Sequence, residues 1–123
     1  MTMAKKIDNP PLVLYTGHKF RVMQTAEFVE FLPSLRDRRA VAKINDRLLR
    51  AADGNFGDVK DAGKGVSEMR IDYGPGYRVY FSQRGNELIV LLCGGDKRAQ
   101  DRDITYAKRL KAELDRDSGI APV

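Results

Sequence analysis

Six consecutive apolar residues, from Leu88 to Cys93, constrain the fold more than any other segment of the chain. A strand with one solvent face alternates apolar and polar residues, and this run does not alternate. It therefore predicts a central strand that is buried on both faces, with Gly94-Gly95-Asp96 ending it. The 123 residues favour one domain built around that strand.

Two segments before this run alternate as half-buried strands do. Val66–Tyr73 and Tyr77–Gln83 are separated by Gly74-Pro75-Gly76, and a second turn leads into a strand at Glu87–Cys93. Because successive side chains of a strand point to opposite faces, six apolar residues are expected to share the face that meets the helices. They are Met69, Ile71, Tyr73, Tyr77, Val79 and Phe81.

Three segments have the periodicity of amphipathic helices. They are Ala26 to about Leu32 after the potential cap Thr25, Asp37–Ala52, and Arg102–Arg116. The first two are expected to form an antiparallel helical hairpin. With a short strand at Phe20–Gln24, the order of elements predicts an α+β domain.

The domain is expected to span residues 20–117. Residues 1–19 contain Asn9-Pro10-Pro11 and have no regular period, so they predict a poorly structured leader. Residues 118–123 are expected to form a tail. The start of the chain resembles no secretory signal and no segment is apolar enough to span a membrane, which favours a cytoplasmic protein without membrane contact.

Charge favours an acidic or polyanionic partner. The formal net charge is +5, from 22 Lys and Arg against 17 Asp and Glu, and the predicted helix at Asp37–Ala52 is strongly basic. One cysteine, Cys93, excludes an internal disulfide and a Cys-based zinc site, and is expected to be buried. One histidine, His18, makes a His-based triad or metal site implausible.

The other face of the first two meander strands carries the candidate chemistry. Glu68, Arg70, Arg78 and Tyr80 share that face, and Lys97 with Arg98 follows the neighbouring strand. Such a face can bind phosphates, stack on bases and move protons, or it can be a solvated face of cross-strand ion pairs. On either interpretation Arg78 lies outside the core, and its replacement is expected to cost little stability.

The same strands carry a family resemblance. Four segments resemble the HigB-like "addiction module killer" branch of the RelE/ParE toxin superfamily. They are Gly54–Lys60, Gly65–Ile71, the hairpin Tyr73–Phe81 and the strand end Leu91–Lys97. The resemblance runs from about Phe20 to Leu114. It implies a small twisted antiparallel sheet with a helical hairpin on one side, and the toxin of a bacterial type II toxin–antitoxin pair.

RelE-type relatives cut mRNA, commonly at the ribosome, by attack of the substrate's own 2′-hydroxyl and without a metal or other cofactor. The resemblance implies that Arg78 stabilises the phosphate, with Arg70 as a second cation and Lys97 beside the leaving group. Glu68 and Lys60 are the two candidates for the general base. Arg98 and Tyr80 are expected to contact RNA.

The resemblance also implies a cognate antitoxin of the helix-turn-helix type. Two other functions fit the same fold: a ParE-like inhibitor of DNA gyrase, and a catalytically inactive module that only binds its antitoxin. The cations Arg70, Arg78 and Lys97 favour the nuclease over these alternatives.

Overall fold

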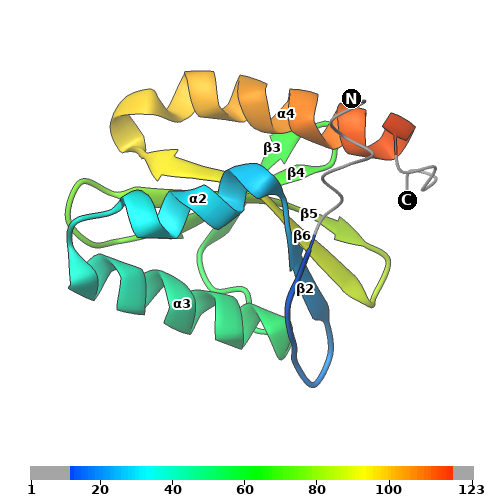
Figure 1. Cartoon of the computed structure of the whole chain (residues 1–123), viewed down its shortest axis with the longest axis horizontal. Helices are drawn as coiled ribbons and strands as arrows, with labels where there is room; N and C mark the ends of the chain where they lie inside the picture. Colours follow the sequence, from blue (N-terminus) through cyan, green and yellow to red (C-terminus); the bar gives the residue numbers. More distant parts are fainter. Residues whose placement is uncertain (1–11, 118–123) are drawn as a thin grey trace.

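A mixed six-stranded sheet forms the centre of the protein, with strands in the order β1-β2-β6-β5-β4-β3 (Figure 1). The computed structural model describes residues 12–117, and only the backbone of residues 12–15 and 117. The strands are β1 (Leu12–Thr16), β2 (Arg21–Gln24), β3 (Val59–Gly63), β4 (Val66–Ile71), β5 (Tyr77–Arg84) and β6 (Leu88–Asp96). The α-helices are α2 (Ala26–Ser34), α3 (Arg38–Ala52) and α4 (Gln100–Asp117), and a 3-10 turn η1 (Lys97–Ala99) precedes α4. The predicted α+β class is confirmed.

Strand β6 is central, as its unbroken apolar run predicts. It lies between β5, which it pairs antiparallel, and β2, which it pairs parallel from Arg21↔Leu88 to Gln24↔Leu91. Every residue from Ile89 to Cys93 is buried. The expectation of a purely antiparallel sheet is therefore wrong at this one junction, where two segments far apart in the sequence meet.

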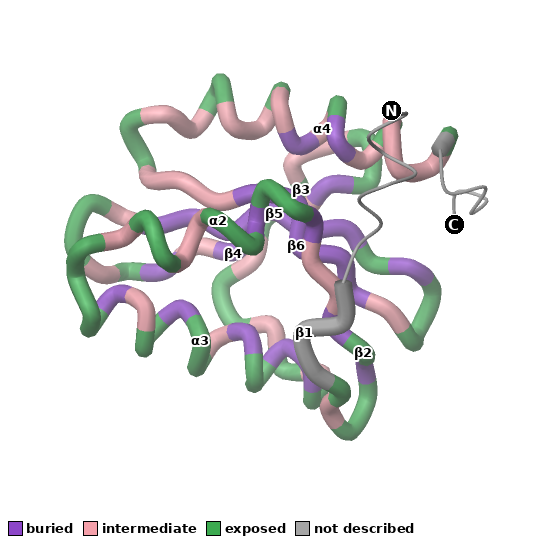
Figure 2. The backbone as a smooth tube through the Cα atoms, in the orientation of Figure 1, coloured by how far each residue is buried: buried purple, intermediate pink, exposed green. Residues whose placement is uncertain are grey.

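The sheet carries a hydrophobic core on each face. On one face, Met69, Ile71, Val79 and Phe81 join side chains of α2 and α3, as the alternation predicts. On the other, Val66, Tyr80 and Leu92 join Ala107 and Leu110 of α4. Figure 1 shows α4 and α3 on opposite sides of the strands, and Figure 2 shows the buried segments concentrated in the strands between them.

The two helices after β2 begin at capping residues. The hydroxyl of Thr25 accepts a hydrogen bond from Phe28 N at 3.1 Å and donates to the carbonyl of Leu92 at 2.6 Å, which ties the start of α2 to β6. The carboxylate of Asp37 caps α3 by accepting from Arg39 N and Ala40 N. Because Asp37 is the cap, the first helical residue of α3 is Arg38, one later than expected.

Arg47 holds α3 to the segment that leads into the sheet. Its Nη1 donates to the carbonyl of Arg70 at 2.6 Å, and its Nη2 donates to the carbonyls of Phe56 and Asp58 at 3.1 and 3.3 Å. Desolvation lowers the pKa of its guanidinium. The helical periodicity assigns Arg47 to the solvent face of α3, but this side chain bridges two parts of the fold.

Replacing Arg47 by alanine is expected to lower the free energy of unfolding by about 1–3 kcal/mol, because three carbonyls lose a charged donor and two of these hydrogen bonds are partly buried. Urea denaturation of both proteins measures the change. Arg50→Ala is the matched control, since the side chain of Arg50 on the same helix forms an exposed ion pair with Asp46. Equal stability of the two variants would contradict the bridging role.

Three segments differ from the sequence expectation. Residues 12–16 form strand β1 rather than part of a leader, and residues 1–11 and 118–123 lie outside the described residues. Strand β3 was not expected. Strand β6 continues through Gly94 and Gly95 to Asp96 instead of ending at Cys93.

The two glycines of β6 allow helices to approach it closely from both sides. A Cβ on Gly94 would overlap the ring of Phe31 in α2, and a Cβ on Gly95 would overlap the carboxylate of Asp103 in α4. The glycine pair is thus a packing site within the strand rather than its end.

None of the helices in the described part of the chain has the length and apolar composition that crossing a bilayer requires.

Candidate functional site

Helix α4 covers much of the sheet face that the sequence predicts to be polar and open. Tyr80 is 0% exposed, Glu68 1% and Arg78 9%, so the expectation of a solvated face is wrong for these three residues. Glu68, Arg78 and Gln100 come together where α4 begins. The burial follows from contacts between β4, β5 and α4, which no local pattern reveals.

A carboxylate held by one ion pair and one hydrogen bond forms the centre of this cluster. Arg78 Nε lies 2.7 Å from Glu68 Oε2 in an ion pair, and Gln100 Nε2 donates to the same oxygen at 2.8 Å. Glu68 comes from β4, Arg78 from β5, and Gln100 from the first position of α4. Sequence reasoning missed Gln100, because its only signal is its position just after the predicted cation pair.

The guanidinium of Arg78 is also held by its own strand. Nη1 donates to the carbonyls of Gly76 and Tyr77 at 3.0 and 3.2 Å. Gly76 has φ +83, and a Cβ there would lie 3.3 Å from Arg78 Nη1 and 3.4 Å from Lys97 Cβ. Gly76 therefore lets Arg78 and Lys97 approach the same turn. Arg78 is fixed, buried and ion-paired, which contradicts the expectation that its replacement costs little stability.

Two further cations lie directly across the strands from this cluster. Arg70 is paired with Arg78 in the β4–β5 register, and Lys60 is paired with Glu68 in the β3–β4 register. Arg70 Nη2 donates to Asp58 at 2.9 Å, which raises the pKa of the Arg70 guanidinium. Lys60 is exposed. The structure thus gathers Lys60, Arg70 and Arg78 around Glu68.

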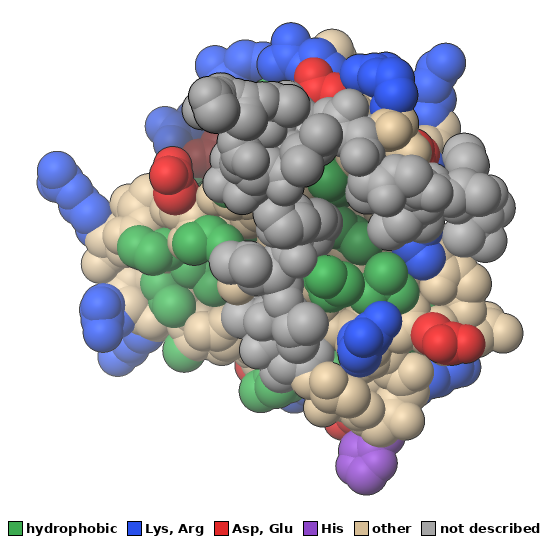
Figure 3. Space-filling view, turned by 45° about the vertical axis from the view of Figure 1, so that its right-hand side comes forward, with side chains coloured by type: hydrophobic (Ala, Val, Ile, Leu, Met, Phe, Trp, Pro, Cys, Tyr) green, Lys and Arg blue, Asp and Glu red, His purple; other side chains and the backbone are tan. Residues whose placement is uncertain are grey.

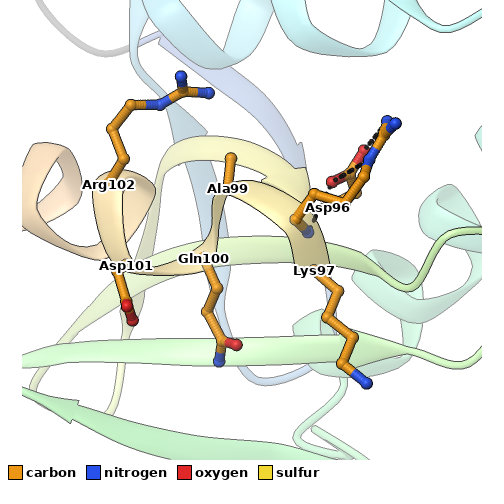
Figure 4. A pocket seen from close by; sticks show the side chains of 7 residues that line it. Asp96, Lys97, Ala99, Gln100, Asp101 and Arg102 are labelled. Carbon is orange, nitrogen blue, oxygen red and sulfur yellow. Dashed lines mark hydrogen bonds and ion pairs between the residues drawn. The ribbon is translucent and has the colours of Figure 1, made fainter.

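The turn before α4 forms one wall of an open hollow of ≈ 680 Å³ lined by residues 96–102. Figure 4 shows Lys97 and Gln100 extending toward the sheet, whereas Arg102 extends the opposite way. Arg98 is exposed and donates to Asp96 at 2.8 Å, which lowers the pKa of that carboxyl. Lys97 therefore extends on the same side of the turn as Gln100, whereas Arg98 is held by Asp96.

Tyr80 is not available to stack on a base. It is enclosed by Val66, Leu92 and Ala107, and burial raises the pKa of its phenol, so the hydroxyl stays protonated. Among residues 12–117 this buried hydroxyl has no hydrogen-bond partner. The expectation that Tyr80 contacts RNA is wrong in this structure, because α4 fills the space above it.

Cys93 is expected to resist alkylation in the native protein. It is 5% exposed, and burial with the nearby Asp103 carboxylate raises the pKa of its thiol to about 12. The reactive thiolate is therefore scarce at neutral pH. Iodoacetamide labelling followed by mass spectrometry should modify Cys93 only after denaturant is added. Rapid labelling of the folded protein would show that α4 does not cover this strand.

Positive charge is spread beyond α3. Arg102 and Arg109 of α4 are exposed, and Figure 3 shows Lys and Arg side chains along the top of the molecule, where α4 lies. Within residues 12–117, no three His, Cys, Asp or Glu side chains are grouped as ligands of a metal ion would be.

Comparison with known proteins gives one relationship. A protein of Haemophilus influenzae, named only as uncharacterized, is 49% identical over 94 residues, which are 76% of this chain and 95% of that protein. The chain belongs to the same family as that protein. No family model matches the chain, and no solved structure matches it.

Proposed function

We propose that this protein is the toxin of a bacterial type II toxin–antitoxin pair and that it cleaves mRNA. The observation that carries the proposal is the fixed guanidinium of Arg78, held by Glu68 and two backbone carbonyls beside Lys97, Arg70 and Lys60. A reaction at a phosphate group requires several oriented cations around that group. A RelE-like arrangement, with α2 and α3 as its helical hairpin, is part of this proposal.

The proposed reaction is an internal transesterification of RNA. A base removes the proton of a 2′-hydroxyl, the 2′-oxygen attacks the adjacent phosphorus, and the bond from phosphorus to the 5′-oxygen breaks. The leaving 5′-oxygen takes a proton from an acid, so the products are a 2′,3′-cyclic phosphate and a 5′-hydroxyl. Arg78 stabilises the charge of the phosphorane, Arg70 adds a second cation, and Lys97 is the acid.

Lys60 is the base that fits this geometry better than Glu68. The carboxylate of Glu68 is nearly inaccessible and is bound to Arg78 and Gln100, so a 2′-hydroxyl cannot reach it without displacing them. Lys60 is exposed directly across from it. Glu68 then acts as a positioning residue for Arg78, and the choice between the two bases is open to test.

The test uses purified protein added to a translating extract, with mapping of mRNA ends. The wild type is expected to produce new 5′-hydroxyl ends, and Lys60→Ala is expected to reduce their rate of formation by 10²-fold or more. Lys43→Ala is the matched control, because Lys43 is exposed on α3, on the opposite side of the sheet. Cleavage by Lys60→Ala at the wild-type rate would return the role of base to Glu68.

The proposed partners are mRNA, the ribosome and a helix-turn-helix antitoxin, in the cytoplasm. Controlled expression should arrest growth, and co-expression of an adjacent small repressor-like gene should relieve the arrest. Gyrase cleavage complexes without new RNA ends would favour the ParE-like alternative. Binding of the antitoxin with neither activity would favour the inactive module.

A further inference from the structure

Gln100 connects the start of α4 to the ion pair in the sheet. Its Nε2 donates to Glu68 Oε2 at 2.8 Å, and Arg78 Nε is 2.7 Å from that same oxygen. An ionised carboxylate only accepts hydrogen bonds, so the amide group must present its nitrogen to Glu68. One oxygen therefore contacts two different elements, through an ion pair with β5 and a hydrogen bond from α4.

Helix α4, which carries Gln100, is held in place at both of its ends. Its N–H is bonded to the carbonyl of Lys97, where η1 passes into α4. At the far end of α4, Asp115 bonds Arg84 of β5 and Lys111. Between these ends, Ala107 and Leu110 are buried against the sheet. The backbone at Gln100 is therefore fixed, so the side-chain amide of Gln100 can orient Glu68.

We propose that Gln100 is a positioning residue, which holds Glu68 so that Glu68 in turn orients the Arg78 guanidinium toward the substrate phosphate. This inference rests on the proposed function for its catalytic consequence. The contact itself is a property of the folded chain and can be tested without RNA. Gln100 would touch no reacting atom, so its effect passes entirely through Glu68.

The role predicts that the order of the Arg78 side chain depends on the donor at position 100. Gln100→Leu removes that donor, so Glu68 loses one of the two contacts that hold it, and the Arg78 Nε–H should exchange with water faster than in the wild type. Gln100→Lys keeps a donor at the same position and should exchange more slowly than Gln100→Leu. Lys60 of β3, Arg70 of β4 and Tyr80 of β5 also lie near Glu68, and both substitutions leave them unchanged.

The measurement is nitrogen-15 NMR of the exchange of the Arg78 Nε–H with water in the full chain. Gln83→Leu is the matched control, because Gln83 is exposed and its amide donates to the nearby Gly85 carbonyl. The expected result is faster exchange in Gln100→Leu, partial recovery in Gln100→Lys and no change in the control. General loosening of the fold would not be reversed by restoring a donor at this one position. Wild-type exchange in Gln100→Leu, or equally fast exchange in both Gln100 variants, would overturn the proposal.

RNA cleavage provides the second measurement. Gln100→Leu is expected to lower kcat by roughly 10- to 100-fold with a smaller change in KM. If the wild type cleaves no RNA, the proposed function fails, and the exchange measurement still decides whether Gln100 positions Glu68. If the wild type cleaves RNA and Gln100→Leu cleaves it equally well, the positioning role fails alone.

Discussion

Replacing Arg78 by alanine is expected to lower the free energy of unfolding by about 3–5 kcal/mol, the usual cost of removing one partner of a buried ion pair. Glu68 is 1% exposed, and in this variant Gln100 would remain as its neutral donor. The carbonyls of Gly76 and Tyr77 would lose the Arg78 donor as well. Thermal unfolding should show a melting temperature lower by roughly 10 °C or more.

A double variant separates the charge from the side-chain volume. Glu68→Leu combined with Arg78→Met removes both charges and keeps most of the buried volume, and it should recover much of the lost stability. A change within about 0.5 kcal/mol for Arg78→Ala alone is typical of surface positions and would show that the pair is solvated. The stability loss has to be measured before any activity loss of Arg78→Ala is interpreted.

Arg78→Lys is expected to fold and to cleave RNA about 10²- to 10³-fold more slowly than the wild type. Lysine keeps a positive charge next to Glu68, but it lacks the planar fork that can bond Glu68, the turn carbonyls and a phosphate together. Loss of one oriented donor to a developing oxyanion has a cost of this size in other enzymes. Single-turnover cleavage of a defined mRNA measures it.

Arg50→Lys is the control for this exchange. Arg50 lies on α3, its side chain is 60% exposed, and it forms an ion pair with Asp46 one helical turn away. The Arg50→Lys variant should cleave RNA at the wild-type rate. Wild-type cleavage by Arg78→Lys would mean that only the charge at this position matters, and the proposed orientation of the guanidinium would be wrong.

Helices and strands with a strong hydrophobic periodicity could be predicted from the sequence. The apolar spacing of α3 and the alternation of β4 and β5 both reflect burial against one neighbouring layer, so the pattern records the structure directly. Strand β3 could not be found in this way. It pairs only with β4 at the edge of the sheet, and its sequence, Val-Lys-Asp-Ala-Gly, has no apolar alternation.

The candidate site shows a different limit of sequence reasoning. The positions of Glu68 and Arg78 on one sheet face could be predicted, because that depends only on strand parity. Their burial could not, because it depends on α4 and on an amide 32 residues away in the chain. A charged residue that pairs across strands has the same local sequence as one that is solvated.

The parallel contact between β2 and β6 determines when this protein can fold during its synthesis. Arg21 pairs with Leu88, so β2 has no partner on its inner side until β6 has been synthesised and has left the ribosome. Until then α2 and α3 also lack the β4–β6 surface on which their apolar side chains are buried. Closing such a long loop is slow relative to forming local contacts. We therefore expect the nascent chain to gain its native sheet only after β6 has left the ribosome, which leaves an interval in which a newly made molecule is not yet functional.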